Sequence, residues 1–392
     1  MQQKSNKRAS LIRRKKVYSI MSGIFVGTIA GILLLNIILP SREFSSNENR
    51  SLASRPAISL STLSSGKFFK DFNTYYSDQF AGRDIWMSVK ALGGAISGNR
   101  ESNNVIFGKH GYLFQYPTVP SDSAIANTAN AINSFTDAHS DLRQTMILVP
   151  DAADILDEEL PANAPVRNQS EDIRSFERKL NIKIGMVDAE PILESAASGH
   201  QIYYKTDHHW TSYGAYSVFL GAAEQLGIGT PVNYKGRVVS DSFKGTLASR
   251  SGRNITNDSI EIYEQDGTDV AYMVNYPDTG ESSASMYVSD KLKEKDHYQI
   301  FFGGNHPLVE IKTTADNQRN LLIFKDSYAN SFVQFLIPYY EKIILVDPRY
   351  YYDNINTAMT SYGITDVLYL YSADTLLTDT GLADTLNTGS AE

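Results

Sequence analysis

The chain has 392 residues, no cysteine and a formal net charge of −8. The absence of cysteine excludes a disulfide scaffold, a cysteine-ligated zinc site, an iron–sulfur cluster and a cysteine nucleophile. Hydrophobic residues make up 42% of the chain, which excludes a disordered polypeptide. The acidic balance is unlike the basic surface of a nucleic-acid binder, so we expect no nucleic-acid partner.

The N-terminal segment differs in charge from the rest of the chain. Residues 1–16 carry seven lysines and arginines and no acid, which leaves a net charge of −15 on the remainder. Residues 17–39 carry no charge, and as a helix they would span about 34 Å, enough to cross a bilayer. Positive charges mark the cytoplasmic flank of a membrane helix. We therefore predict a single-pass protein of the cell membrane, with a cytoplasmic stub over 1–16, a transmembrane anchor over 17–39 and an extracytoplasmic remainder.

A cleaved signal peptide is the alternative to this anchor. Its apolar core would have about 7–15 residues before a small-x-small cleavage site. Here the core is longer and runs into Pro40, so we favour an uncleaved anchor. Gly23, Gly27 and Gly31 lie on one helix face and would permit close packing with another membrane helix, although glycine is common in such segments.

The remainder divides into a linker and a folded α/β domain. Residues 40–66 are rich in serine, which is typical of a linker. The domain is predicted over 67–392 and opens with an amphipathic helix at 67–80, where aromatic residues recur every three to four positions. Further on, short apolar strands alternate with helices, which predicts a parallel sheet covered by helices. The predicted strands are 146–149, 182–187, 321–324, 343–346 and 367–370, and the predicted helices include 211–226 and 328–340.

Residues 232–315 interrupt this alternation. Strand-like segments follow one another there without helices between them, at 260–263, 270–274, 286–288 and 298–302. They predict a β-rich insertion in the α/β domain.

The segment Asp207-His208-His209-Trp210 carries the most chemical information. In an extended or loop backbone, side chains two residues apart point the same way, so Asp207 and His209 can share a face. A carboxylate beside an imidazole fixes its tautomer and stabilises the imidazolium, which supplies two members of a serine triad. The structural alternative is that each histidine only packs or hydrogen-bonds, and we expect this of His208.

The missing nucleophile is expected where a strand ends and a helix begins, because a serine is exposed there and backbone amides can stabilise an oxyanion. Ser327 follows the predicted strand 321–324, so it is the candidate nucleophile, with its own N–H as one oxyanion donor. Ser331 would lie one turn further on and is worse placed. The structural alternative is that Asp326 and Ser327 only cap the helix.

The Asp-His-His-Trp motif, the Thr-Ser-Tyr-Gly-Ala run after it and the later Asp-Ser pair resemble the bacterial DHHW family. That family is similar to the SGNH-hydrolase-like alginate O-acetylation proteins, and the resemblance covers most of residues 45–375. It implies an SGNH-hydrolase-like, flavodoxin-like sheet. It also implies that Asp207 orients His209, that His209 acts as the base and that Ser327 becomes acylated.

The chain departs from the esterase pattern in two ways. The triad order is Asp, His, Ser, as in the alginate-acetylation relatives, and Lys325 replaces the glycine of the esterase serine motif. Gly304 and Asn305 are candidates for the family's oxyanion glycine and asparagine. Trp210 and Tyr328 are candidates for contacts with substrate, Trp210 through stacking on a sugar ring, unless it packs beneath His209.

The implied chemistry is acyl transfer through an acyl-serine, with no cofactor and no metal. Attack by a sugar hydroxyl would make the protein an O-acetyltransferase acting on a cell-surface or secreted polysaccharide. Attack by water would make it a carbohydrate O-acetyl esterase. Relatives of this kind commonly work beside a membrane-bound O-acyltransferase, which would supply the acyl group and could dock on the glycine face. The charge of −15 disfavours a highly anionic polymer as partner.

Two other classes of function stay open. A metal-dependent phosphoesterase would also use an Asp-His-His motif, but it needs further carboxylates at strand ends, and the sequence offers no convincing set. A non-catalytic polysaccharide-binding or export scaffold would keep the fold without the serine chemistry. Covalent labelling of Ser327 separates the enzyme from the scaffold.

Overall fold

A computed structural model describes residues 2–45, 50–253, 255–267 and 270–388. The chain divides into two compact units, one up to Lys90 and one from Ala91 onward.

The first unit holds the N-terminal helices. Helix α1 (Gln2–Ile38) contains a stretch, Arg13–Ile38, that is long and apolar enough to cross a membrane. Helix α3 (Lys67–Asp78) confirms the predicted amphipathic helix, with ring contacts along one side such as Phe68 on Phe72. The segment predicted as a linker contains three short elements: β1 (Phe44–Ser45), β2 (Arg50–Ser51) and α2 (Leu60–Ser64). Helix α4 (Arg83–Ile96) begins in this unit.

The second unit is built on an eight-stranded mixed sheet with the order β11-β10-β12-β14-β13-β15-β6-β7. Its five strands from β14 to β7 are parallel, and they include all five predicted strands. They are β6 (Arg143–Val149), β7 (Ile184–Asp188), β13 (Asn320–Lys325), β14 (Lys342–Val346) and β15 (Asp366–Ser372). These runs of apolar residues are buried on both faces, as expected of parallel strands.

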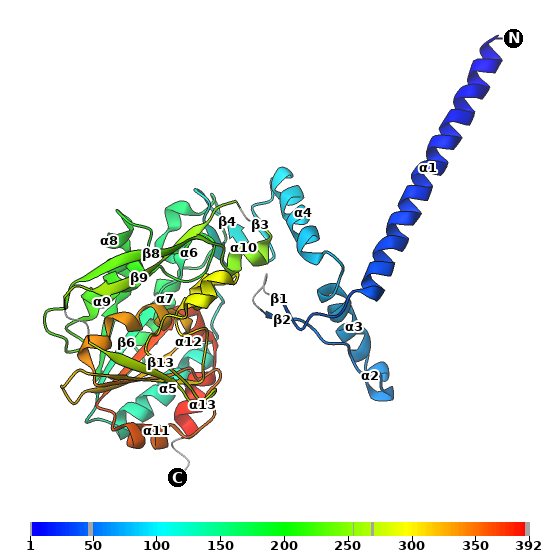
Figure 1. Ribbon diagram of the computed structural model, residues 1–392. Helices are drawn as coiled ribbons and strands as arrows, with labels where there is room; N and C mark the ends of the chain where they lie inside the picture. Colours follow the sequence, from blue (N-terminus) through cyan, green and yellow to red (C-terminus); the bar gives the residue numbers. More distant parts are fainter. Residues whose placement is uncertain (1, 46–49, 254, 268–269, 389–392) are drawn as a thin grey trace. The chain divides into compact units, whose positions relative to one another are not determined.

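Elements cover both faces of the sheet, which gives three layers (Figure 1). Alternate residues of β6 enter opposite cores, Ile147 and Val149 on one face and Met146 and Leu148 on the other. One face is covered by α5 (Asp122–Ala138), α7 (Gln169–Glu177), α11 (Ile355–Tyr362), α12 (Ala373–Thr378) and α13 (Gly381–Thr388). The other face is covered by α8 (Ala189–Ala197), α9 (Ser212–Ala222), β8 (Tyr234–Phe243), β9 (Asp258–Gln265) and residues 327–340. The smaller elements are β3 (Glu101–Ser102), β4 (Val105–Phe107), β5 (Leu113–Gln115), α6 (Ala152–Ile155), η1 (Asp157–Glu159), α10 (Thr246–Ser251) and η2 (Ser289–Lys293).

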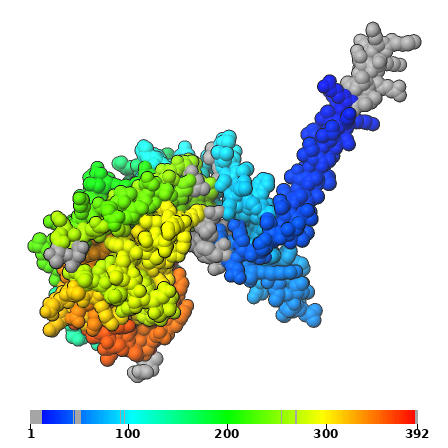
Figure 2. All heavy atoms as spheres, in the orientation of Figure 1, coloured from blue at the N-terminus to red at the C-terminus, as the bar shows by residue number. Residues whose placement is uncertain are grey.

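The segment predicted as a β-rich insertion partly extends the main sheet. Its strands β10 (Tyr272–Tyr276), β11 (Glu281–Ser283) and β12 (Leu308–Thr313) add an antiparallel edge beside β14, so the sheet is mixed rather than purely parallel. Figure 2 shows the yellow atoms of this segment beside the orange atoms of the part of the chain that follows it. Among the described residues of this segment, β8 and β9 pair with each other, separately from the main sheet.

Two predicted strands in this segment are wrong. Residues 286–288 contribute only an isolated bridge between Tyr287 and Phe301. Residues 298–302 fall largely in the 3-10 helix η3 (His297–Ile300). Their apolar side chains are buried in the core cluster, and a short buried run does not distinguish a strand from a helical turn.

Candidate active site

The Asp-His-His-Trp segment forms a tight loop whose ends are held together by backbone hydrogen bonds. Tyr203 and Trp210 form an antiparallel bridge, and the Thr211 N–H donates to the Ile202 carbonyl at 2.8 Å. The Thr211 side chain then caps α9 by accepting from the Gly214 N–H. The motif is therefore a short loop that leads directly into a capped helix, and its side chains are fixed from both sides.

Ser327 lies just after the carboxyl end of β13, as predicted. The preceding Asp326 is fully buried and holds the turn, since one of its oxygens accepts from the Tyr328 N–H and the other from the Ser372 N–H and hydroxyl. Ser327 itself is partly exposed. The serine is thus presented at the sheet edge by a buried aspartate that bridges two neighbouring strands.

The predicted α-helix over 328–340 is wrong. The segment forms three 3-10 turns, η4 (Ser327–Ser331), η5 (Val333–Phe335) and η6 (Ile337–Tyr339). The carbonyls that an α-helix would use are occupied by side chains: Tyr298 Oη donates to Ser327 O, Trp210 Nε1 to Tyr328 O and Gln334 Nε2 to Ser331 O. The segment that begins at Ser327 is therefore a series of short turns, and the helix N-terminus predicted at this serine is not formed.

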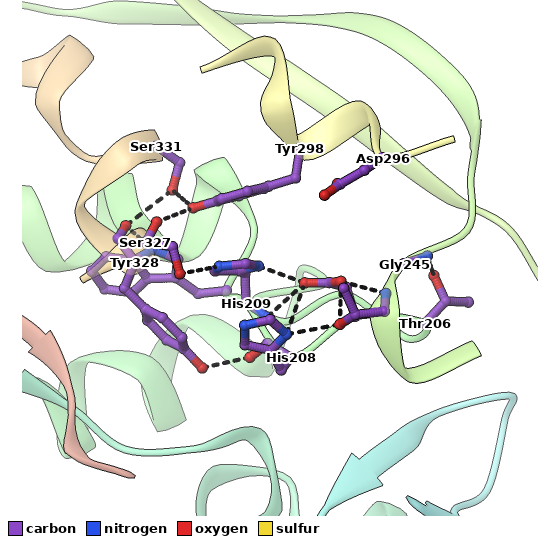
Figure 3. A network of polar contacts seen from close by, with 12 residues as sticks. Thr206, His208, His209, Gly245, Asp296, Tyr298, Ser327, Tyr328 and Ser331 are labelled. Atoms are coloured by element: carbon purple, nitrogen blue, oxygen red, sulfur yellow. Dashed lines mark hydrogen bonds and ion pairs between the residues drawn. The ribbon is translucent and has the colours of Figure 1, made fainter. Parts of the chain in front are cut away.

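The three predicted triad residues form one hydrogen-bonded chain (Figure 3). Ser327 Oγ lies 2.8 Å from His209 Nε2, and His209 Nδ1 lies 2.5 Å from Asp207 Oδ1. Asp207 and His209 are buried, with 1% and 6% of their surface exposed. The carboxylate therefore accepts a hydrogen bond from the Nδ1–H of the imidazole, which leaves Nε2 as the acceptor for the serine hydroxyl.

Asp207 is held by residues that sequence reasoning did not identify. Its Oδ2 accepts from the Thr246 N–H at 2.7 Å and from the Thr246 hydroxyl at 2.9 Å. Burial alone would raise the pKa of Asp207, but the adjacent imidazoles of His208 and His209 and these hydrogen bonds lower it well below its usual range. The group is thus an ionised, fully hydrogen-bonded carboxylate.

A further layer fixes Thr246 in turn. Asp258 accepts from both the N–H and the hydroxyl of Thr206, and the Thr206 oxygen accepts from the Gly245 N–H at 3.0 Å. This chain links β9 to the loop before α10, where Gly245 precedes Thr246. The sequence does not indicate this chain of hydrogen bonds, because its residues come from three separate segments.

Tyr298 is a further site residue that the sequence did not reveal. Its ring stacks on His209, with centroids 3.9 Å apart and an interplanar angle of 12°, and its hydroxyl donates to the Ser327 carbonyl at 2.9 Å (Figure 3). One side chain therefore contacts both the imidazole and the serine backbone. Its place in a segment mistaken for a strand gave no signal for this role.

The predicted contacts of Trp210 and Tyr328 with substrate are contradicted by burial. Trp210 is fully enclosed, stacks on Phe332 and donates its indole N–H to the Tyr328 carbonyl. Tyr328 is 1% exposed, and its hydroxyl donates to the His208 carbonyl. Both side chains tie the histidine loop to the serine turn and cannot reach a ligand. His208 makes a hydrogen bond with the Thr246 hydroxyl at 2.9 Å, and burial lowers its pKa.

The structure separates the two oxyanion candidates. Gly304 has a φ of 131°, which requires glycine, and its N–H points to the Phe301 carbonyl. Asn305 is exposed and lies beside the serine turn, where its Oδ1 accepts from Asn330 Nδ2 at 3.4 Å. The side-chain oxygen of Asn305 therefore faces Asn330 of the serine turn.

The ligand atoms of Asp207, His208 and His209 lie within 4.8 Å of one another, a spacing that could suit a metal ion. Both Asp207 oxygens, however, already accept hydrogen bonds from the protein, and His209 faces Ser327 with its other nitrogen. The donor set therefore fits a proton relay better than a metal centre.

The fold and site together define a mixed α/β protein with a hydrogen-bonded Ser–His–Asp chain at the carboxyl edge of its parallel strands. The DHHW family model, described as DHHW protein, matches residues 105–346. This is more than half of the chain, so the protein belongs to the DHHW family, and the resemblance predicted from the motif is confirmed.

The chain is similar to several solved structures, including the following three. A DHHW family protein from Eubacterium siraeum is 26% identical, with a TM-score of 0.61, over 72% of this chain and 95% of that one. Bacillus cereus PatB1 with a sulfonyl adduct is 18% identical, with a TM-score of 0.59, over 71% and 98%. The O-acetyltransferase domain of Pseudomonas putida AlgJ is 14% identical, with a TM-score of 0.46, over 73% and 99%. No curated protein matches the sequence.

Proposed function

We propose that this protein is a serine acyl-transfer enzyme that moves an acetyl group to a hydroxyl of a cell-surface or secreted polysaccharide through an acyl-Ser327 intermediate. The observation that carries the proposal is the continuous hydrogen-bonded chain from Ser327 through His209 to an ionised Asp207. A structural cap needs no imidazole on the serine oxygen, and a buried charged aspartate is costly unless it is used or fully paired.

The reaction follows from this geometry. His209 Nε2 takes the hydroxyl proton as Ser327 Oγ attacks the carbonyl carbon of the acyl donor. The tetrahedral intermediate collapses, its bond to the leaving group breaks, and the leaving group takes the proton from His209. A sugar hydroxyl then gives its proton to His209 while its oxygen attacks the carbonyl carbon of the acyl-serine. The bond between that carbon and Ser327 Oγ breaks, and Ser327 Oγ takes the proton from His209, which releases the ester product and restores the serine hydroxyl. Asp207 stabilises the imidazolium in both halves.

Two donors are proposed for the developing oxyanion. The Ser327 N–H stands at the first position of a 3-10 turn, where an amide has no acceptor within the turn. Asn305 lies beside the same turn with its amide nitrogen turned away from Asn330. Together they supply two N–H groups near the nucleophile, the number that an oxyanion commonly receives.

The proposed location is the outer side of a membrane, with α1 as an uncleaved anchor. The apolar Arg13–Ile38 stretch and the seven positive charges of residues 1–16 support this orientation. No cytosolic acetyl donor is available on that side, so the proposal includes a membrane-bound O-acyltransferase as the source of the acyl group.

The test uses full-length protein in detergent with a fluorophosphonate probe, read by intact-protein mass spectrometry. One adduct is expected on the wild type and on Ser331→Ala, which removes a fully buried hydroxyl in the same turn, and none on Ser327→Ala. No adduct on the wild type, or an equal adduct on Ser327→Ala, would contradict the enzyme and favour a non-catalytic scaffold. Labelling that is lost on chelation would favour a metal enzyme.

Transferase and esterase are separated by the fate of the acyl group. With p-nitrophenyl acetate as donor, a transferase gives more acetylated sugar than free acetate when an oligosaccharide acceptor is added. An esterase gives acetate alone, whatever acceptor is present.

A further inference from the structure

A cavity of about 760 Å³ lies along α11, on the opposite face of the sheet from residues 327–340, and only its end at Pro307 and Tyr350 reaches the edge of the sheet that carries Ser327. Its wall is formed by three chain segments: the turn after β10, the start of β12, and the stretch from the end of β14 into α11. Four of its lining residues are tyrosines, Tyr350, Tyr351, Tyr352 and Tyr362. No step of the proposed acyl transfer uses this cavity.

Strand register places this end of the cavity at the same edge of the sheet as the serine turn. Phe324 of β13 pairs with Val346 of the parallel β14, so the chain leaves both strands at the same edge, toward Ser327 on one and toward Tyr350 on the other. The stretch before β12 connects the two places: Asn305 receives a hydrogen bond from Asn330 of the serine turn, and Pro307 accepts from the Asp347 N–H at 3.1 Å. An extended ligand would therefore have to pass around the edge of the sheet, along residues 305–307, to contact both the serine and the cavity.

The tyrosine wall is built on a rigid base. Arg349 donates two hydrogen bonds to the fully buried Asp347, at 2.8 and 2.6 Å, and its guanidinium lies 5.4 Å from the Tyr350 ring centroid. On the opposite side, His306 fixes Asp278 through a hydrogen bond of 2.8 Å. The cavity is thus formed before any ligand arrives, which lowers the entropic cost of binding.

The chemistry of the wall selects a kind of ligand. Tyr350 and Tyr352 are 47% and 86% exposed, so their ring faces are open to a flat apolar surface such as the face of a pyranose. Asp278, Asp353 and Asn354 supply acceptors for sugar hydroxyls. None of the described lining residues is lysine or arginine, and Asp278 and Asp353 are acidic, so the lining itself offers no cationic side chain to a carboxylate-bearing sugar.

We propose that this cavity is an acceptor subsite that binds a pyranose unit without a carboxylate. This unit lies one or more sugar units away from the sugar that receives the acetyl group from Ser327. The inference rests on the proposed function, because it names the class of acceptor for the same site. Tyr352 and Tyr350 stack on the ring, and Asp278 and Asp353 accept from its hydroxyls.

The experiment measures binding separately from catalysis. Full-length Ser327→Ala in detergent is screened on an array of neutral, amino-sugar and uronate oligosaccharides, and the retained members are titrated by calorimetry. Neutral or amino-sugar members should be retained and uronates should not. Adding Tyr352→Ala or Tyr350→Ala should weaken binding about tenfold or more, which corresponds to about 1.4 kcal/mol.

The matched control is Ile182→Ala, which truncates an apolar side chain that is 98% exposed and lines no part of the cavity. It should bind as the parent does. Tyr352→Trp keeps an aromatic face and should restore binding, which excludes misfolding as the cause of a loss. The subsite is overturned if no oligosaccharide is retained, if only uronates are retained, or if the tyrosine variants bind as the parent does. Failure of the acyl-transfer proposal appears instead as the absence of a phosphonate adduct on Ser327.

Discussion

Gly245 lies so close to Asp207 that a β-carbon at Gly245 would stand 2.3 Å from the Asp207 β-carbon and 2.4 Å from its Oδ2. The glycine has a φ of −76° and a ψ of −171°, a conformation open to any residue, so the requirement is steric and not conformational. This contact lets the next residue, Thr246, bring its N–H within 2.7 Å of the same carboxylate oxygen.

Gly245→Ala is therefore expected to displace Asp207 and to slow phosphonate labelling of Ser327 by about 100-fold, because a misaligned carboxylate no longer holds the imidazole. The measurement is the second-order labelling rate. Gly199→Ala is the control, since a β-carbon there meets nothing within 4 Å. Equal rates in the two variants would show that the close contact does not position the aspartate.

Asp207→Asn tests the carboxylate itself. The amide has one oxygen acceptor and one NH2 donor in place of two acceptor oxygens. The variant must therefore lose a bond from His209 or Thr246, and the imidazole is free to adopt the wrong tautomer. We expect acylation by p-nitrophenyl acetate to fall by about 10³ to 10⁴, the size of loss typical of this change in serine triads. The fold should persist, as measured by circular dichroism. A loss under tenfold would argue that Asp207 is only a structural anchor.

The motif residues could be predicted because they carry their chemistry locally. Asp207 and His209 stand two residues apart, and Ser327 follows a strand that is recognisable by its apolar run. Tyr298, Thr246 and Asp258 could not be found in this way. Their contacts are made only by the tertiary fold, and none of them stands in a sequence pattern that marks it.

The limits of the fold prediction have the same cause. The parallel strands were recognisable because their burial on both faces requires continuous apolar runs. The helix expected over 328–340 fails because Tyr298, Trp210 and Gln334 supply side-chain donors to its carbonyls, and two of these donors come from distant segments. The antiparallel edge joins the sheet through β12, and no local signal states which strand a given strand will pair with.

Asn305→Ala tests the proposed oxyanion donor. Removing one such donor commonly lowers kcat by about 10² to 10³ while KM changes little, because the bond strengthens only in the transition state. Steady-state hydrolysis of p-nitrophenyl acetate separates the two constants. A rise in KM at constant kcat would instead place Asn305 among groups that bind the ground state.

Asp151 gives a prediction about stability and pH. It lies at the end of β6, is 2% exposed, and one of its oxygens has no hydrogen-bond partner among the described residues. Burial, with Asp374 and Asp326 nearby, raises its pKa from 3.8 to about 7, against the opposing hydrogen bonds of Gln115 and Gln169. Because the pKa is raised in the folded state, the stability it contributes is full below about pH 4 and is lost as the pH rises toward 7.

Asp151→Asn removes this titration. Its free energy of unfolding should match that of the wild type near pH 4 and exceed it by about 2 to 4 kcal/mol at pH 8. Urea unfolding at several pH values measures the difference, and Asp141→Asn at an exposed position serves as the control with no such trend. A constant offset between Asp151→Asn and the wild type across this range would show that Asp151 does not change its charge on unfolding. The contribution of this end of β6 to the free energy of unfolding would then come from packing alone.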